Sequence, residues 1–252
     1  MKNNFLFLLF LASFFLIAFR SGASANQLAV ELSSNQVQIN TGFNGIDLLL
    51  FGTTNGADDI IVVIKGPPET NLVRKKSRVA GVWANTEKVL IKNTPNFYAV
   101  AATRPLDQIS NKSILHAHEI GIENLSVSIP EEKRKSSNTT FNDYRQALFR
   151  LKSRLGLFII QPLKINLIQN QLFKTEIHFP PNMSTGTYMA QIYSFKKGTL
   201  VDTINKLISV EKVGLGAEVF GLAHKHSALY GILAIFIAVA SGWIAAIIFR
   251  KV

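Results

Sequence analysis

The chain has 252 residues, of which 48% are hydrophobic and 17% are charged, and its formal net charge is +11. It contains no cysteine, which excludes a disulfide framework, a thiolate zinc site, an iron–sulfur cluster and a cysteine nucleophile. The apolar content is higher than a soluble domain needs, because two long apolar segments lie near the ends of the chain.

Residues 1–25 have the pattern of a secretory signal peptide. Lys2 supplies the positive start, an apolar run follows over residues 5–19, and the small residues Ala23 and Ala25 precede a predicted cleavage before Asn26. An uncleaved N-terminal anchor is the alternative. The pattern predicts that the chain from residue 26 onward is exported.

The C-terminal segment Leu229–Phe249 contains no charged residue and, as a helix, spans roughly 31 Å, the thickness of a bilayer core. Arg250 and Lys251 follow it, and the positive-inside rule places the tail 250–252 in the cytoplasm. Residues 213–228 are expected to form an interfacial segment. We therefore expect a single-pass protein of the inner membrane, with its globular region in the periplasm.

The apolar C-terminal segment has a stripe of small residues with a spacing of four. The stripe consists of Ala234, Ala238, Gly242 and Ala246. Such stripes let membrane helices approach closely, so the pattern indicates a homodimer or docking onto an integral membrane protein. The alternative is that alanine and glycine are simply common in membrane helices.

Residues 26–212 show mostly strand patterns. Apolar residues alternate over residues 28–32, and short apolar runs at 46–51 and 60–64 flank Asn55-Gly56. This dipeptide between two such runs predicts a β-hairpin.

The later part of this region alternates more clearly, with Phe173, Thr175, Ile177 and Phe179 on one face of a strand. Further strands are expected at 187–195 and 200–210, so that the three form an antiparallel meander. The spacing predicts a mainly β fold, an immunoglobulin-like β-sandwich. It leaves open one β-rich region or two modules, about 26–128 and 157–212.

Two helical patterns interrupt the strands. One extends from Pro105 to Gly121, and the other lies in the segment 138–156, with Gly156 as its C-terminal cap. The apolar stripe of the second helix is Phe141, Tyr144, Leu148, Leu151 and Leu155. Its other face carries Arg145, Arg150, Lys152 and Arg154, which we expect to point outward from the sandwich.

A dense basic run, Arg74, Lys75, Lys76 and Arg78, precedes Trp83. One interpretation is a charged edge strand that resists pairing with other chains. The other is a site for anions or lipid headgroups, with Trp83 as an apolar contact and with Arg150 and Arg154 completing the patch. Nucleic acid is not expected as a partner in the predicted compartment.

Candidate catalytic residues are sparse. His116-x-His118-Glu119 has metal-ligand residue types, but positions two apart on a helix point about 200° from each other, so we expect no metal site there. The nucleophile-elbow, zinc-protease, phosphate-loop and dinucleotide motifs are absent from the sequence. We expect no enzyme activity and no cofactor; a periplasmic metal-dependent hydrolase is the enzymatic alternative.

Several segments resemble an uncharacterised alphaproteobacterial family of transmembrane proteins. They are the run 74–85, the segments 97–100, 104–107 and 118–121, and the ending 242–250. The resemblance implies a signal peptide, a periplasmic β domain and a C-terminal single-pass helix. It also implies a genetic association with permeases resembling sulfite exporters.

Together these patterns favour a non-catalytic accessory subunit of a transporter or envelope complex. The alternative is a membrane-tethered module that binds anionic lipid or cell-wall material through the basic patch. The sequence identifies no small-molecule ligand.

Overall fold

The computed structural model describes residues 28–128, 141–214, 219 and 222–249. The predicted signal peptide with Ala23 and Ala25, and the tail with Arg250 and Lys251, lie outside the described residues. Among those described, strands predominate and one apolar helix forms the C-terminal end, which confirms the mainly β prediction.

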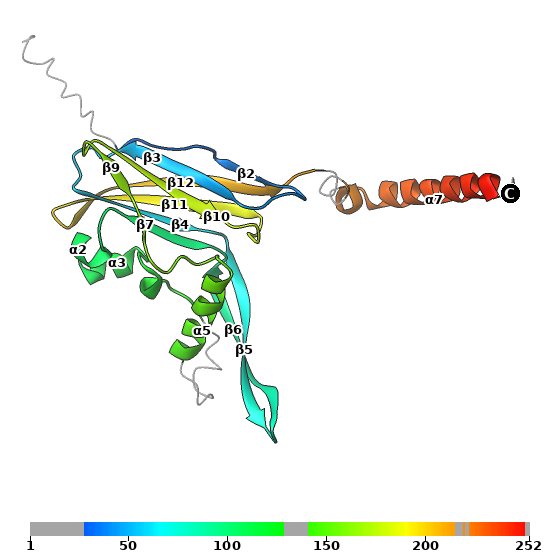
Figure 1. Ribbon diagram of the computed structural model, residues 1–252, viewed down its shortest axis with the longest axis horizontal. Helices are drawn as coiled ribbons and strands as arrows, with labels where there is room; N and C mark the ends of the chain where they lie inside the picture. Colours follow the sequence, from blue (N-terminus) through cyan, green and yellow to red (C-terminus); the bar gives the residue numbers. More distant parts are fainter. Residues whose placement is uncertain (1–27, 129–140, 215–218, 220–221, 250–252) are drawn as a thin grey trace, which may run out of the picture.

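Two sheets pack face to face around one hydrophobic core (Figure 1). The first has the order β1-β3-β10-β9, and the second has the order β2-β12-β11-β4-β7-β8. The first sheet contains β1 (Val30–Leu32), β3 (Ile46–Thr53), β9 (Asn166–Ile168) and β10 (Leu172–Phe179). The second contains β2 (Gln36–Ile39), β4 (Asp59–Lys65), β7 (Tyr98–Ala102), β8 (Leu163–Lys164), β11 (Gly186–Lys196) and β12 (Thr199–Lys212).

The predicted hairpin at Asn55-Gly56 is wrong. Both residues have positive φ, 52° and 72°, as a tight turn requires, but β3 and β4 belong to different sheets. The turn instead carries the chain across the sandwich, and Thr54 fixes it by bonding to Asn170 and Gln171. A turn dipeptide sets the local dihedral angles, whereas burial of both apolar strands decides their partners.

The predicted meander is correct only in its second half. β11 and β12 form a hairpin through Lys197 and Gly198, which have φ of 50° and 80°. β10 lies in the other sheet and pairs with β3 and β9, so Pro180–Asn182 connects the two layers. Strands from 26–128 and 157–212 therefore share both sheets, since β3 pairs with β10 and β4 pairs with β11.

The segment 105–121, expected as one helix, contains two short helices, α2 (Leu106–Ile109) and α3 (Lys112–Ala117). The 3₁₀ helix η1 (Ile122–Asn124) follows directly after it. The break occurs because Ser110 is extended and Asn111 caps α3, its Oδ1 accepting a bond from Ile114 N at 2.9 Å. The second predicted helix is confirmed as α5 (Phe141–Arg154), and residues 138–140 of the predicted segment are not among those described.

The C-terminal helix α7 (Ser227–Phe249) confirms the predicted apolar span. It has 23 residues and a mean hydropathy of 2.6, and none of it is buried against the sandwich. At about 1.5 Å per residue it is long enough to cross a bilayer. It is the one such helix within the described ranges.

Candidate functional site

A long two-stranded ribbon projects from the sandwich (Figure 1). It consists of β5 (Pro68–Val79) and β6 (Val82–Pro95), and we call it the arm. The strands are joined by Ala80 and Gly81, whose φ values of 48° and 85° make a two-residue hairpin turn. The sequence pattern did not predict this hairpin, and Gly81 was the signal that could have revealed it.

Cross-strand register places the basic side chains on one face of the arm. Arg74 is opposite Lys88, Lys76 is opposite Asn85, and Arg78 is opposite Trp83. Alternate residues of a strand share a face. We call the set Arg74, Lys76, Arg78 and Lys88 the basic face; all four are exposed. No ion pair joins them to a carboxylate of the described chain.

The opposite face of the arm packs against α5. Val73, Val89 and Ile91 are buried there. Glu87 lies 3.6 Å from Lys75 Nζ and accepts a hydrogen bond from the Tyr144 hydroxyl of α5. The carboxylates of the arm are therefore engaged on this face and do not neutralise the basic face.

At the base of the arm, Lys152 of α5 forms an ion pair with Glu69 of β5. The Lys152 side chain is only 7% exposed; its ammonium also lies 3.4 Å from Asn96 O and 5.9 Å from the centre of the Phe158 ring. The prediction that Lys152 points outward is wrong. Its ammonium group lies between α5 and β5, where the Glu69 carboxylate neutralises it.

The residues of the predicted anion patch do not lie on one surface. Arg74, Lys76 and Arg78 lie together with Trp83 near the tip, whereas Lys75 points to the α5 face. Arg150 and Arg154 are exposed on α5, which covers the other side of the arm. The sequence offered no reason to include Lys88 in the patch, because the residues around it in β6 are not a basic run.

The tip of the arm is apolar and open. Val79 pairs with Val82 across the turn, and Val82 and Trp83 are 70% and 68% exposed. Single exposed apolar side chains are common, but neighbouring ones that form one exposed patch mark interaction sites more often. The arm therefore presents a cationic strip that ends in an apolar point.

Two residues of the candidate metal motif, His118 and Glu119, make other contacts in the structure. Glu119 forms an ion pair with Lys65 and accepts a bond from Ser126 N at 3.1 Å, while His118 packs edge-on against Tyr193 at 5.2 Å. Burial acts to raise the pKa of Glu119, but the bonds from Lys65 and Ser126 outweigh it and lower the pKa. Among the described residues no group of three or more His, Asp or Glu side chains is placed to hold a metal ion.

A second buried polar group closes the end of the sandwich near α2. Asp59, 2% exposed, accepts bonds from Arg104 Nε at 2.7 Å and from Thr103 Oγ1 at 2.8 Å. The hydrogen bond from Arg104 holds the pKa of Asp59 below its ordinary value. The pair is structural, because it joins β4 to the start of the α2 segment.

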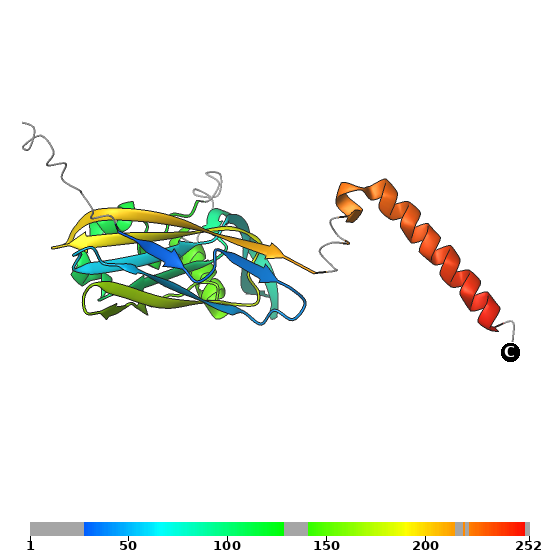
Figure 2. The same ribbon diagram turned by 90° about the horizontal axis from the view of Figure 1, so that it is seen from above.

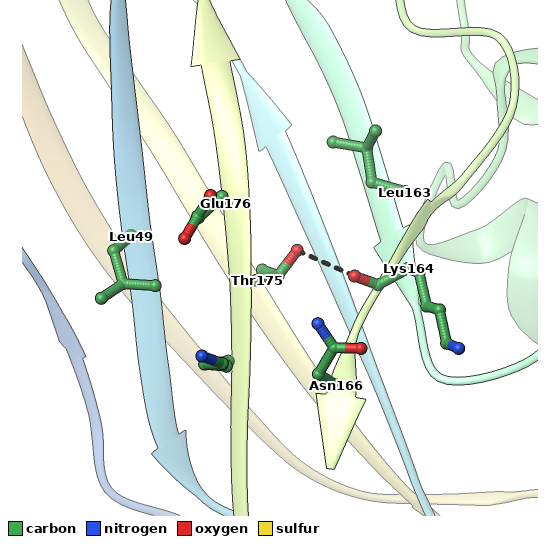
Figure 3. Close-up of a pocket in the computed structure, with 7 residues that line it drawn as sticks. Leu49, Leu163, Lys164, Asn166, Thr175 and Glu176 are labelled. Carbon is green, nitrogen blue, oxygen red and sulfur yellow. Dashed lines mark hydrogen bonds between the residues drawn. The ribbon is translucent and has the colours of Figure 1, made fainter.

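A shallow pocket of about 280 Å³ lies where the chain passes from β8 to β9 beside β10 (Figure 3). The Thr175 hydroxyl donates across it to Lys164 O at 3.4 Å. The side chain of Lys164 points away from Glu176 (Figure 3).

The small-residue stripe of α7 is exposed along its length, at Ala234, Ala238, Gly242 and Ala246. Figure 2 shows α7 as a separate rod beyond the sandwich. Nothing in the described chain packs on it, so the predicted packing face remains open to another helix.

The β sandwich, the arm and the apolar helix α7 define the chain as a membrane protein, with one candidate span among the described residues, at the C-terminal end. It belongs to the family described as "Putative transmembrane protein (Alph_Pro_TM)", whose model matches residues 27–251. Searches of curated proteins and of solved structures found no match.

Proposed function

We propose that the chain is a non-catalytic, membrane-anchored binding module that serves as an accessory subunit of a transporter or envelope complex. In this proposal α7 holds it in the inner membrane, the sandwich lies in the periplasm, and the arm is the binding element. The observation that carries the proposal is the tip, where Val82 and Trp83 are 70% and 68% exposed. A projecting element with an apolar end is suited to reach a partner beyond the sandwich.

The periplasmic placement is supported by the basic residues Arg250 and Lys251 after the span, because such residues stay on the cytoplasmic side. The signal-peptide pattern of residues 1–25 gives the same orientation.

An immunoglobulin-like sandwich is part of the proposal. It is supported by the strand order β1-β3-β10-β9 against β12-β11-β4-β7, which parallels that of immunoglobulin domains with an added edge strand. Tyr188, near the start of β11, donates a hydrogen bond to Ser184 O at 2.7 Å, as in the tyrosine corner of such domains. Buried Ala190 occupies the position two residues later, where many of those domains have a cysteine.

Site-specific photo-crosslinking tests the role of the arm. A crosslinking residue at Val82 of the full chain, activated in native membranes, is expected to give adducts with a membrane component. The control position is Val201 of β12, which is 62% exposed on the sandwich. Equal adducts from both positions, or none from Val82, would contradict a binding role for the tip.

Co-purification in mild detergent tests the accessory role. A multi-span partner, first sought among permeases resembling sulfite exporters, is expected with the wild-type chain and with Ala240→Leu, but not with Ala238→Leu. Positions two apart point about 200° from each other on a helix, so the pair of variants compares the stripe with the opposite side of α7. If all three chains elute alone, the accessory role is wrong.

A further inference from the structure

The basic face contains a cross-strand pair of like charges. Arg74 and Lys88 are directly opposite in register, a position in which like charges destabilise a β ribbon. Both carboxylates of the arm, Glu69 and Glu87, are on the other face and are engaged with α5 or Lys75. The repulsion between Arg74 and Lys88 is thus not relieved within the described chain, and an external anion would relieve it.

The tip restricts which anion fits. Arg78 is opposite Trp83, and Val79 and Val82 follow at the turn, so a cationic strip passes directly into exposed apolar side chains. A bilayer surface presents these two environments in the same order, phosphate groups and then acyl chains, and tryptophan favours their boundary. An acidic protein would satisfy the charges but would need a matching apolar pocket for the tip.

The anchor keeps the arm near such a surface. Residues 213–226 connect β12 to α7 and, even fully extended, span at most about 50 Å. A tether of this length raises the effective concentration of the arm at the bilayer that holds α7.

We propose that the basic face of the arm binds the phosphate groups of an anionic phospholipid bilayer, with Val82 and Trp83 inserted at headgroup level. This inference rests on the proposed function in one respect, that the arm is the binding element. It adds the identity of the partner and the four side chains that recognise it.

Tryptophan quenching in lipid nanodiscs tests this docking. The chain has two tryptophans, so Trp243→Phe in α7 leaves Trp83 as the reporter. Both kinds of disc carry brominated acyl chains, which quench tryptophan emission on contact. Trp83 emission is expected to be quenched in discs that mix phosphatidylglycerol with phosphatidylcholine, but not in discs of phosphatidylcholine alone. Quenching should disappear in about 1 M salt, where the Debye length is about 3 Å.

Two matched double variants locate the surface. Arg74→Gln/Lys88→Gln and Arg150→Gln/Arg154→Gln remove the same charge from different places. Each basic residue near an anionic surface contributes about fivefold, so the first pair should lower the ratio of docked to free arm roughly 25-fold. The second pair should leave quenching unchanged.

A charge reversal separates docking from folding. Lys88→Glu creates an ion pair with Arg74, so amide hydrogen exchange in the arm should slow while quenching is lost. Quenching that is equal in neutral and anionic discs, or equal loss in both double variants, would overturn the proposal. Crosslinking of Val82 to a protein rather than to lipid would leave the binding module standing and refute the bilayer as its partner.

Discussion

Lys152 of α5 and Glu69 of β5 form an ion pair that fixes the base of the arm to the helix beside it. A second contact, from the Tyr144 hydroxyl to Glu87, lies nearer the tip, so α5 runs along the arm and holds it at two points. The direction in which the arm projects depends on these two contacts.

Replacing Lys152 with methionine should destabilise the domain and loosen the arm. The change leaves the Glu69 carboxylate without its partner, which is expected to lower the free energy of unfolding by about 1–3 kcal/mol. Thermal unfolding and hydrogen exchange of β5 and β6 measure the two effects.

Arg154→Met is the matched control, because Arg154 is exposed on the same helix. A double-mutant cycle with Glu69→Gln isolates the pair, and purely additive effects would show that the ion pair is not the link.

The Asp59–Arg104 pair predicts acid sensitivity. Because the pKa of Asp59 is lower in the folded state than its ordinary value of 3.8, the pair stabilises the fold fully above that value. The contribution is lost as the pH falls through the lower, folded-state pKa. Free energies of unfolding measured between neutral pH and about pH 3 should fall below about pH 4.

Asp59→Asn should weaken the acid-dependent part of this fall and lower the free energy of unfolding at neutral pH by about 1.5–3 kcal/mol. Exposed Asp58→Asn, which keeps an acceptor for Lys197 N, should change it little. The role assigned to Asp59 fails if the two variants behave alike.

Tyr188→Phe removes a single hydroxyl from a fully buried ring. The lost bond to Ser184 O should lower the free energy of unfolding by about 0.5–1.5 kcal/mol without a change of fold. Burial raises the pKa of Tyr188 to about 12, so the hydroxyl stays protonated at physiological pH. Tyr230→Phe in α7 is the control, and equal unfolding free energies for the two variants would argue against a structural corner.

The turn of the arm can be improved. Ala80 has φ of 48°, a value that asparagine tolerates better than alanine, and Asn-Gly is the preferred pair for such a turn. Ala80→Asn should slow hydrogen exchange in β5 and β6, because it should raise the free energy of opening of the arm by about 0.5–1 kcal/mol. Ala84→Asn places the same side chain within strand β6 and should speed exchange; the opposite order would mean that the turn does not limit opening of the arm.

The positions of several strands were predictable, but their pairing was less so. Phe173, Thr175, Ile177 and Phe179 are buried while Lys174, Glu176 and His178 between them are exposed, so alternation alone located β10. The partner of β10 is β3, more than a hundred residues earlier, and no local pattern identifies it. The Asn55-Gly56 turn misled the prediction because a sheet-to-sheet connection uses the same dihedral angles as a hairpin.

The candidate site was predictable only in part, for a similar reason. Arg74, Lys76 and Arg78 attract attention as a run, whereas Lys88 is inconspicuous until register places it opposite Arg74. Lys152 was expected on the surface because a cation usually is, and only its proximity to Glu69 accounts for its burial.

The parallel pairing of β2 with the end of β12 has a mechanical consequence. β2 holds the last residues of β12, from Ser209 to Lys212, and Val213 N bonds to Ile39 O immediately before the connection to α7. A force applied through the anchor along β12 loads these hydrogen bonds in shear, so that several must break together rather than one after another. The β2–β12 pairing therefore resists traction in the direction from which the membrane attachment would pull.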